Sequence, residues 1–474
     1  MKKRIRCAAG HLTSSAFCAS LAILAACSDG GQGNDPGDGL PVASCTENLR
    51  KQFVLDTTRD WYLFQDLLPA TANPEDYETA EELLDHLTAT AREQGKDRHF
   101  TYLTTREEDD ALFGDGRYYG FGFRSRLLPD DRSFIVEVFE NSPAAANGLR
   151  RGDEILAIDA GDGYFPVTDL LDQNTSLSDL FGPAEPGVQR GLRLLRDGLP
   201  LEVSLTKDLV TIDPVDNLGG VTVLPLQGTN GVGYLNLRSY VSAAEPQIIE
   251  AFENFRGRGI DYFIVDLRYN GGGLIYIAEI MNNLLGGARR RTDVQYRIAH
   301  NPMRSSEDSS VFFRPLDASA WPVRIAFLTT GATASASELN INSMRAWVEV
   351  AIVGENTFGK PVGQYAFDLS GCEDRLRLVS FKSENAAGDT DYFDGLAGEL
   401  RFACDAEDTL DRPPGDPLEG MTAAALHWIS TGACARPMGV AAPAQAKSRI
   451  GLPSDFARSR QPPRPVDLWN PGAT

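Results

Sequence analysis

An α/β fold is predicted for the section between residues 213 and 437, and three features of the sequence support it. Strand-like apolar runs alternate there with helical patterns. Two of these runs, Val323–Leu328 and Val348–Val353, are mainly apolar along their whole length, as expected for strands that are buried on both faces of a sheet. Small or polar turns follow both runs, and α/β proteins carry functional residues at such strand ends.

The first 26 residues have the features of an export signal and are not expected to be part of the fold. A basic start precedes an apolar run that ends in Leu24-Ala25-Ala26-Cys27, which resembles a bacterial lipobox with Cys27 as the lipidated first residue. An ordinary cleaved signal with an incidental cysteine is the alternative. We expect a lipid-anchored protein of the bacterial cell envelope that faces the periplasm, and Ser28 slightly favours the outer membrane.

Residues 27–44 and 438–474 are expected to lie outside the folded domains. The first stretch is rich in Gly and Asp and predicts a flexible tether, whereas the second is rich in Pro, Ala and Arg and predicts a disordered tail. No segment after the signal approaches the roughly 18 apolar residues of a membrane-spanning helix. The formal net charge of −21 argues against nucleic acid as a partner.

Four cysteines follow Cys27 in the sequence: Cys45, Cys372, Cys404 and Cys434. An even number in an exported protein predicts disulfides, and four cysteines allow three pairings. We prefer Cys372–Cys404, which leaves Cys45–Cys434. A zinc site is disfavoured, because the spacings are long and no histidine lies near these cysteines.

Residues 45–115 predict a helical N-terminal domain. Apolar residues recur at helical spacing from Cys45 to Asp66 and again from Glu78 to Gln94. The aromatic residues of this section are interpreted as core. His86 and His99 are interpreted as surface or interface residues rather than catalytic groups.

Residues 117–208 predict a small β-rich domain. The run Gly120-Phe121-Gly122-Phe123 opens it, and the sequence SPAAANGLRRGDEI begins at Ser142. Both motifs resemble those of PDZ domains, in which the first forms the carboxylate-binding loop. Backbone N–H groups of a glycine-rich turn suit a carboxylate, and an exposed strand edge suits an extended peptide, so the resemblance implies peptide capture. The alternative is a β-domain whose glycines only make turns.

Three consecutive glycines follow the buried strand Tyr262–Leu267 and end at Gly273. Glycines let the backbone approach a ligand closely, and their N–H groups can stabilise negative charge that develops on a substrate oxygen. The alternative is a simple turn into the helical pattern Leu274–Leu285. A phosphate-binding loop is disfavoured, because no Gly-Lys-Ser/Thr motif follows.

Ser335 stands where the strand Val323–Leu328 gives way to a helical pattern. The run Ser335-Ala336-Ser337-Glu338 is a helix capping box, which by itself needs no chemistry. Three features favour a nucleophile instead. Small neighbours leave the hydroxyl accessible, a helix N-terminus stabilises an anion, and Lys360 follows the next strand with Gln364 four residues later.

Lys360 is the candidate base, because a neutral amine can accept the serine proton. The pKa of lysine is about 10.4 and a base at neutral pH needs about 7–8, so the amine must be buried among apolar groups such as Phe358. Gln364 could orient the neutral amine without adding a charge that raises its pKa. A Ser–His–Asp arrangement is the alternative, with His300 in a polar loop and His427 packed in a helix as the available histidines.

Residues 117–437 resemble the S41 family of serine peptidases, the tail-specific or carboxyl-terminal processing proteases. The resemblance rests on the run Asp266–Gly273, on the serine run, and on a Gly-Lys turn 25 residues after Ser335. It implies a ClpP/crotonase-like β/α core, with a preceding or inserted PDZ domain and an N-terminal helical cap. It also implies a catalytic dyad of Ser335 and Lys360, with Gln364 as its third member.

The same resemblance implies an oxyanion hole and no cofactor. The oxyanion donors would be the N–H of Gly272 or Gly273 together with that of Ala336. The chain departs from the family pattern at three positions near the dyad: Thr333, Pro361 and Gly363.

The sequence therefore predicts a serine endopeptidase that hydrolyses exported proteins and recognises unstructured C-terminal tails. Its expected partners are protein or peptide substrates and the membrane, with an adaptor or a second copy of the chain as further candidates. A non-catalytic peptide-binding or scaffold lipoprotein is the alternative function. The intact set Ser335, Lys360 and Gln364 argues against this alternative.

Overall fold

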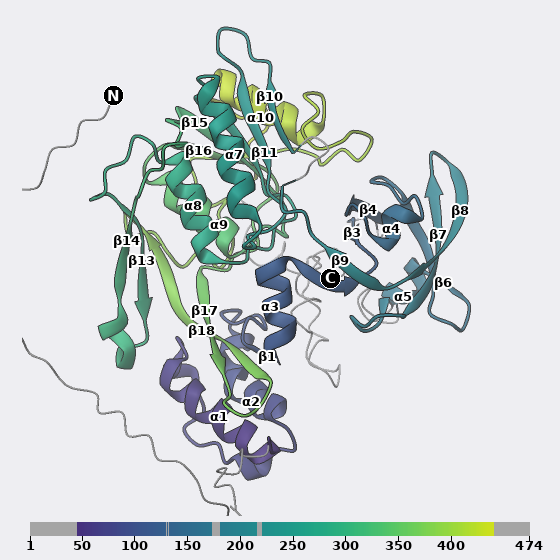
Figure 1. The fold of residues 1–474 in the computed structure, drawn as a ribbon, viewed down its shortest axis with the longest axis vertical. Helices are drawn as coiled ribbons and strands as arrows, with labels where there is room; N and C mark the ends of the chain where they lie inside the picture. The colour runs from purple at the N-terminus through teal and green to yellow at the C-terminus, as the bar shows by residue number, and fades with distance from the viewer. Residues whose placement is uncertain (1–44, 129, 131, 173–180, 216–219, 440–474) are drawn as a thin grey trace, which may run out of the picture. The chain divides into compact units, whose positions relative to one another are not determined.

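The computed structural model describes residues 45–439, except residues 129, 131, 173–180 and 216–219 (Figure 1). The expectations for the signal peptide, Cys27, the tether and most of the C-terminal tail therefore lie outside the described residues. Within these residues, no helix combines the length and the apolar character that are needed to cross a membrane.

A six-stranded sheet forms the centre of the section after residue 213. The strand order is β10-β11-β12-β15-β16-β19, in which only β10 is antiparallel to its neighbour. The strands are β10 (Val221–Leu224), β11 (Val232–Asn236), β12 (Tyr262–Asp266), β15 (Arg324–Thr329), β16 (Glu349–Gly354) and β19 (Phe402–Asp405). The predicted α/β core is thus confirmed, and β15 and β16 each begin and end one residue later than expected.

Helices cover both faces of this sheet. The helices are α7 (Ala244–Gly257), α8 (Ile275–Leu285) and α9 (Ala336–Arg345) on one face, and α10 (Gly420–Thr431) on the other. Ile325 and Phe327 of β15 pack on the side of α7–α9, whereas Ala326 and Leu328 pack on the side of α10. Because successive strand residues point to opposite faces, a sheet covered on both sides needs the continuous apolar runs that predicted it.

A second sheet joins the N-terminal section to the section after residue 213. Its strands are all antiparallel: β1 (Tyr102–Thr105), β13 (Val294–His300), β14 (Ser309–Phe312), β17 (Val362–Asp368) and β18 (Asp374–Asn385). The N-terminal helices are α1 (Glu47–Trp61), α2 (Ala80–Glu93) and α3 (Arg106–Asp115), with short 3-10 turns at Gln65–Leu67, Pro74–Asp76 and, in the β13–β14 connection, Pro302–Glu307. Leu83 and Leu87 of α2 share a core with Leu376 and Leu378 of β18. The N-terminal section therefore packs on this second sheet and adds β1 to it.

Residues 117–211, here called the β-module, form a separate sheet. Its strands and helices are β2 (Arg117–Gly120), β3 (Phe123–Leu127), β4 (Ser133–Val138), α4 (Pro143–Ala146), β5 (Glu154–Asp159), β6 (Tyr164–Pro166), α5 (Val167–Asp172), β7 (Gln189–Arg196), β8 (Leu199–Thr206) and β9 (Asp208–Thr211). The main strand order is β3-β4-β5-β7-β8. The first strand of the β-module, β2, pairs antiparallel with its last strand, β9. The chain therefore enters and leaves the β-module through one two-stranded sheet, as expected for an inserted domain.

The cysteines pair differently from the preferred expectation. Cys45 is bonded to Cys372, with a Cα–Cα distance of 5.2 Å, and Cys404 is bonded to Cys434 at 5.1 Å. The predicted pairs were wrong because sequence spacing does not reveal which loops meet. Cys45 lies just before α1, which packs beside the β17–β18 turn. The segment before Met438 returns alongside β19, and this brings Cys434 to Cys404.

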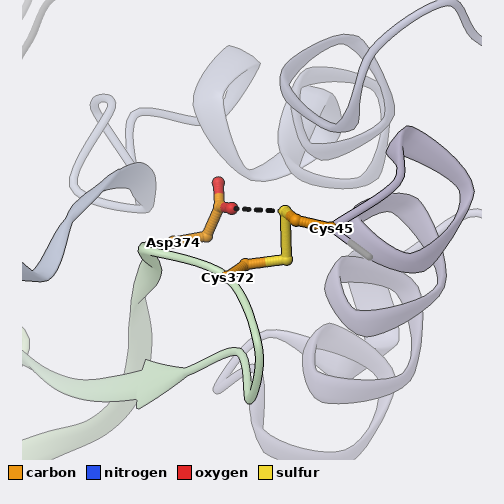
Figure 2. A group of neighbouring side chains, drawn as sticks. All are labelled: Cys45, Cys372 and Asp374. Carbon is orange, nitrogen blue, oxygen red and sulfur yellow. Dashed lines mark hydrogen bonds between the residues drawn. A yellow bond between two sulfur atoms is a disulfide. The ribbon is translucent and has the colours of Figure 1, made fainter. Parts of the chain in front are cut away.

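Asp374 lies beside the Cys45–Cys372 pair, with its carboxylate 3.8 Å from the Cys45 sulfur (Figure 2). Such a group of two cysteines and one carboxylate resembles a metal site in composition. Both sulfurs are bonded to each other, however, and metal ligation by cysteine requires a thiolate. The group is therefore interpreted as a structural link between α1 and β18.

Candidate active site

Ser335 lies on a sharp turn between β15 and α9. Its φ angle is 55°, in the left-handed region that residues other than glycine rarely adopt. Such strained backbone is found where a side chain must be presented in one direction, as on the strand-to-helix turns that carry serine nucleophiles. The side chain is half-buried, at the N-terminus of a ten-residue helix.

The glycine loop after β12 packs directly against this turn. The hydroxyls of Thr333 and Ser337 donate to the backbone carbonyls of Leu267 (2.7 Å) and Asn270 (2.9 Å). A Cβ atom on Gly272 would lie 2.8 Å from both the Ala336 nitrogen and the Ser335 Cβ atom, so only glycine fits there. Thr333, a departure from the family pattern, therefore helps to attach the glycine loop to the serine turn.

The candidate oxyanion donors differ in their hydrogen bonding. The Gly272 N–H donates to the Asn270 side chain at 2.9 Å, so it is already engaged. Gly273 has a φ of 135°, and a Cβ atom there would lie 2.3 Å from the Tyr240 carbonyl oxygen. The Ala336 N–H belongs to the first turn of α9, where backbone donors have no partner within the helix. Of the two glycines, Gly273 is therefore the better candidate to act with Ala336.

Glu338 joins the serine turn to the lysine loop. Its carboxylate is fully buried and accepts the backbone N–H groups of Ser335 (3.0 Å), Gly359 (2.7 Å) and Lys360 (2.7 Å). Burial raises the pKa of Glu338, and these hydrogen bonds lower it in part. The Ser-x-x-Glu motif revealed the bond to Ser335, but the two bonds to the lysine loop had no signal in the sequence.

The Lys360 amine points into a partly apolar site. It donates to the Gln364 side-chain oxygen at 2.6 Å and lies 4.7 Å from the centre of the Phe100 ring. Burial lowers the pKa of Lys360 from 10.5 to about 8. The ring of the expected neighbour Phe358 packs against that of Phe100, with 5.9 Å between the ring centres. Sequence reasoning missed Phe100, which is far from the motifs and carries no recognisable signal.

The two candidate histidines have other surroundings than expected. His300 ends β13 rather than lying in a loop, and its ring is almost fully buried. Its nitrogens contact the Asp308 carboxylate (3.1 Å) and the Tyr365 hydroxyl (3.0 Å). His427 was expected to be packed but is exposed on α10, across the central sheet from α9. This arrangement does not favour a Ser–His–Asp triad.

The run Gly120–Phe123 lies between β2 and β3 of the β-module. Phe121 and Phe123 are buried and pack on Phe181. Gly122 has a φ of 83°, and a Cβ atom there would collide with Ser142 at 2.1 Å. The two PDZ-like motifs thus contact each other, and β3 is an edge strand of its sheet.

A buried charge network links the β-module to the glycine loop. Arg151, in the turn before β5, pairs with Asp408 and donates to the Tyr269 hydroxyl at 3.1 Å. Asp408 also forms an ion pair with Arg268, at 2.6 Å. Burial alone would raise the pKa of Asp408, but the two guanidinium groups hold it well below its ordinary value. Tyr269 and Arg268 directly precede Asn270, so this network supports the start of the glycine loop.

Comparisons with known proteins match two parts of this chain. Residues 231–390 match peptidase family S41, and residues 50–102 match the peptidase S41 N-terminal domain. The chain is 27% identical over 331 residues to a carboxyl-terminal-processing protease of Synechocystis sp.. This match covers 68% of this chain and 71% of the relative. It is also 27% identical over 317 residues to the protease of the same name from Picosynechococcus sp., over 65% of this chain and 69% of that one.

The fold is similar to a crystal structure of a Bacteroides fragilis protein assigned to the S41 proteases. The TM-score is 0.60 at 22% identity, and the match covers 80% of this chain and 97% of that one. At this identity the likeness bears on the fold alone. With the sequence matches, the α/β core and its N-terminal section define a serine-type peptidase. The chain is similar to peptidase family S41 over residues 50–102 and 231–390.

Proposed function

We propose that this peptidase cleaves exported proteins at unstructured C-terminal segments, with Ser335 as nucleophile and Lys360 as base. The observation that carries the proposal is the position of Glu338, which binds the backbone of both residues. The lowered pKa of the amine and its contact with Gln364 add support. The names of the two cyanobacterial relatives, both carboxyl-terminal-processing proteases, favour C-terminal segments as substrates.

In this mechanism, the Ser335 hydroxyl attacks the carbonyl carbon of the scissile amide while its proton moves to the neutral Lys360 amine. The N–H groups of Ala336 and Gly273 donate to the oxygen that becomes negative. The ammonium of Lys360 then protonates the leaving nitrogen, and the C–N bond breaks to leave an acyl-serine. Water, deprotonated by Lys360, hydrolyses this ester and regenerates the serine.

The test is cleavage of an unfolded polypeptide by purified protein. Ser335→Ala and Lys360→Ala should each abolish cleavage while far-UV circular dichroism and thermal unfolding stay close to wild type. Lys382→Ala is the matched control, since Lys382 pairs with Glu384 and Asp391 instead. Wild-type cleavage by either dyad variant would refute the mechanism.

We further propose that the β-module is a PDZ domain that holds the free carboxylate of the substrate at Gly120–Phe123. The contact between the two motifs and the edge position of β3 support this assignment. An anchored, periplasm-facing location through Cys27 is also proposed, and two disulfides fit an oxidising compartment. Mass spectrometry of the membrane fraction should detect a lipid on Cys27 that Cys27→Ser abolishes.

A further inference from the structure

Residues 97–101, here called the 97–101 segment, connect α2 to β1 and contact the lysine loop. The segment is Asp97-Arg98-His99-Phe100-Thr101. It lies far from the lysine loop in the sequence, with a separation of 260 residues between Arg98 and Phe358. The dyad residues Ser335 and Lys360 give no indication in the sequence that this segment is part of the site.

Arg98 holds the backbone just before the candidate base. Its guanidinium donates to the carbonyl oxygen of Phe358 at 3.0 Å and also to that of Gly359. It stacks over the Phe358 ring at 4.1 Å from the ring centre. Both hydrogen bonds come from one guanidinium nitrogen, Nη2, while the guanidinium plane stacks on the ring, and the ammonium of a lysine has no such plane. Arg98 and Glu338 thus hold the turn from both sides, one at its carbonyls and the other at its N–H groups.

Phe100 covers the amine itself and holds its partner. The ring lies 4.7 Å from the Lys360 nitrogen and is 6% exposed. The Phe100 carbonyl oxygen accepts the side-chain N–H of Gln364. This bond leaves the Gln364 oxygen facing Lys360, so it fixes which end of the amide the amine contacts.

The 97–101 segment is itself firmly held. Asp97 is fully buried and accepts the Tyr62 hydroxyl (2.8 Å) and the backbone N–H groups of Phe100 (2.8 Å) and Thr101 (3.1 Å). The Thr101 hydroxyl oxygen accepts the Val379 N–H of β18 at 3.1 Å. Because both ends are fixed, the segment can act as a rigid support.

We propose that Arg98 and Phe100 are positioning residues that hold Lys360 and Gln364 in the geometry of a general base. This inference rests on the proposed Ser335–Lys360 mechanism and adds a part of the site that comes from the N-terminal section. Phe100 excludes water from the amine, and Arg98 sets the path of the loop that carries it.

The charges around the amine oppose one another. Burial is the largest influence and lowers the pKa of Lys360, Asp97 and Glu338 raise it, and Arg377 and Arg98 lower it. The aromatic face of Phe100 also favours the protonated amine. The net pKa of Lys360 is lowered to about 8, so burial, to which the Phe100 ring contributes, outweighs the groups that raise the pKa.

Two Phe100 variants separate these effects through the pH profile of kcat/KM. Phe100→Leu keeps an apolar cover, so its midpoint should stay at or slightly below that of wild type. Phe100→Ser admits water, so its midpoint should rise by about one pH unit, with about tenfold less activity at pH 7 that returns near pH 10. A merely structural role would reduce activity equally at all pH values. An unchanged midpoint in folded Phe100→Ser would overturn the proposal.

Arg98 gives a second, independent test that applies even if Phe100→Ser does not fold. Arg98→Gln removes both the guanidinium plane and the charge, so kcat should fall about tenfold at similar KM and the midpoint should rise. Arg98→Lys keeps the charge, so it should lose kcat while it keeps the midpoint. Unchanged kcat in Arg98→Gln would overturn the role of Arg98.

The dyad variants distinguish failure of this inference from failure of the proposed mechanism. If Lys360→Ala is active, the mechanism itself fails. If Lys360→Ala is inactive at every pH but the Phe100 and Arg98 variants keep the wild-type profile, only the positioning role fails.

Discussion

Ser335 and Lys360 donate their backbone N–H groups to one and the same oxygen of Glu338, at 3.0 and 2.7 Å. The two candidate catalytic residues are therefore held together through their main chains, whatever their side chains do. The second oxygen of Glu338 accepts the Gly359 N–H at 2.7 Å. The geometry requires a carboxylate, because both of its oxygens act as acceptors.

Replacement of Glu338 by glutamine should therefore damage the site without a change in shape. The amide nitrogen of Glu338→Gln would face at least one backbone N–H donor, and an unsatisfied buried pair costs about 1–3 kcal/mol. We expect lower free energy of unfolding in urea and at least about tenfold lower kcat. Glu384→Gln, a half-buried carboxylate on β18, is the control and should leave both values near wild type.

The buried amine should make stability depend on pH in an unusual direction. The pKa of Lys360 is about 8 in the folded protein and near 10.5 when unfolded, so the unfolded chain binds more protons between these values. The free energy of unfolding relative to Lys360→Met should thus rise from pH 8 to pH 10.5, by less than the roughly 1.4 kcal/mol per pH unit that corresponds to one whole proton. Urea unfolding at pH 7.5 and pH 10 measures this, and a constant difference would contradict it.

Because Gln364 is uncharged, it should contact the Lys360 amine without raising the pKa of that amine. Gln364→Glu places a negative charge beside the amine and loses the donor to the Phe100 carbonyl, so the midpoint of the pH profile should rise. Gln364→Met adds no charge and should lower kcat without an upward shift. Equal midpoints in the two variants would show that the charge at this position does not matter.

Arg151 should contribute to stability through Asp408. Arg151→Met leaves that buried carboxylate with one fewer cation, and we expect a loss of about 3 kcal/mol in the free energy of unfolding. Arg193 pairs with Glu202 on an exposed face of the β-module, so Arg193→Met should cost less than about 1 kcal/mol. A matching loss in the two variants would mean that the buried network adds nothing beyond an exposed pair.

The proposed carboxylate loop predicts a preference for free C-termini. A peptide substrate with an amidated C-terminus lacks the charge that the backbone N–H groups of Gly120–Phe123 would bind, so its KM should rise about tenfold or more. The same peptide pair in the presence of excess unlabelled C-terminal peptide provides the control, since competition should affect only the free acid. Equal KM values would exclude the loop as a carboxylate site.

Local patterns predicted the strands and helices of the core well, because apolar runs and helical spacing reflect burial on one or two faces. The turns that carry Ser335 and Lys360 were also visible, since both follow parallel strands. The roles of Arg98 and Phe100 were not visible, because they arise from packing between segments some 260 residues apart. Disulfide pairing failed for the same reason, and Glu338 was read only for its local capping role.

The Cys45–Cys372 bond spans 327 residues, and the glycine loop, the β-module and Ser335 all lie between its two ends. A single backbone cut at any exposed loop in this interval therefore leaves both fragments covalently joined. Nicked protein would migrate as one band on a non-reducing gel and as two bands after reduction. A peptidase is exposed to cleavage by other copies of itself. This bond would keep a molecule that has been cut once in one piece.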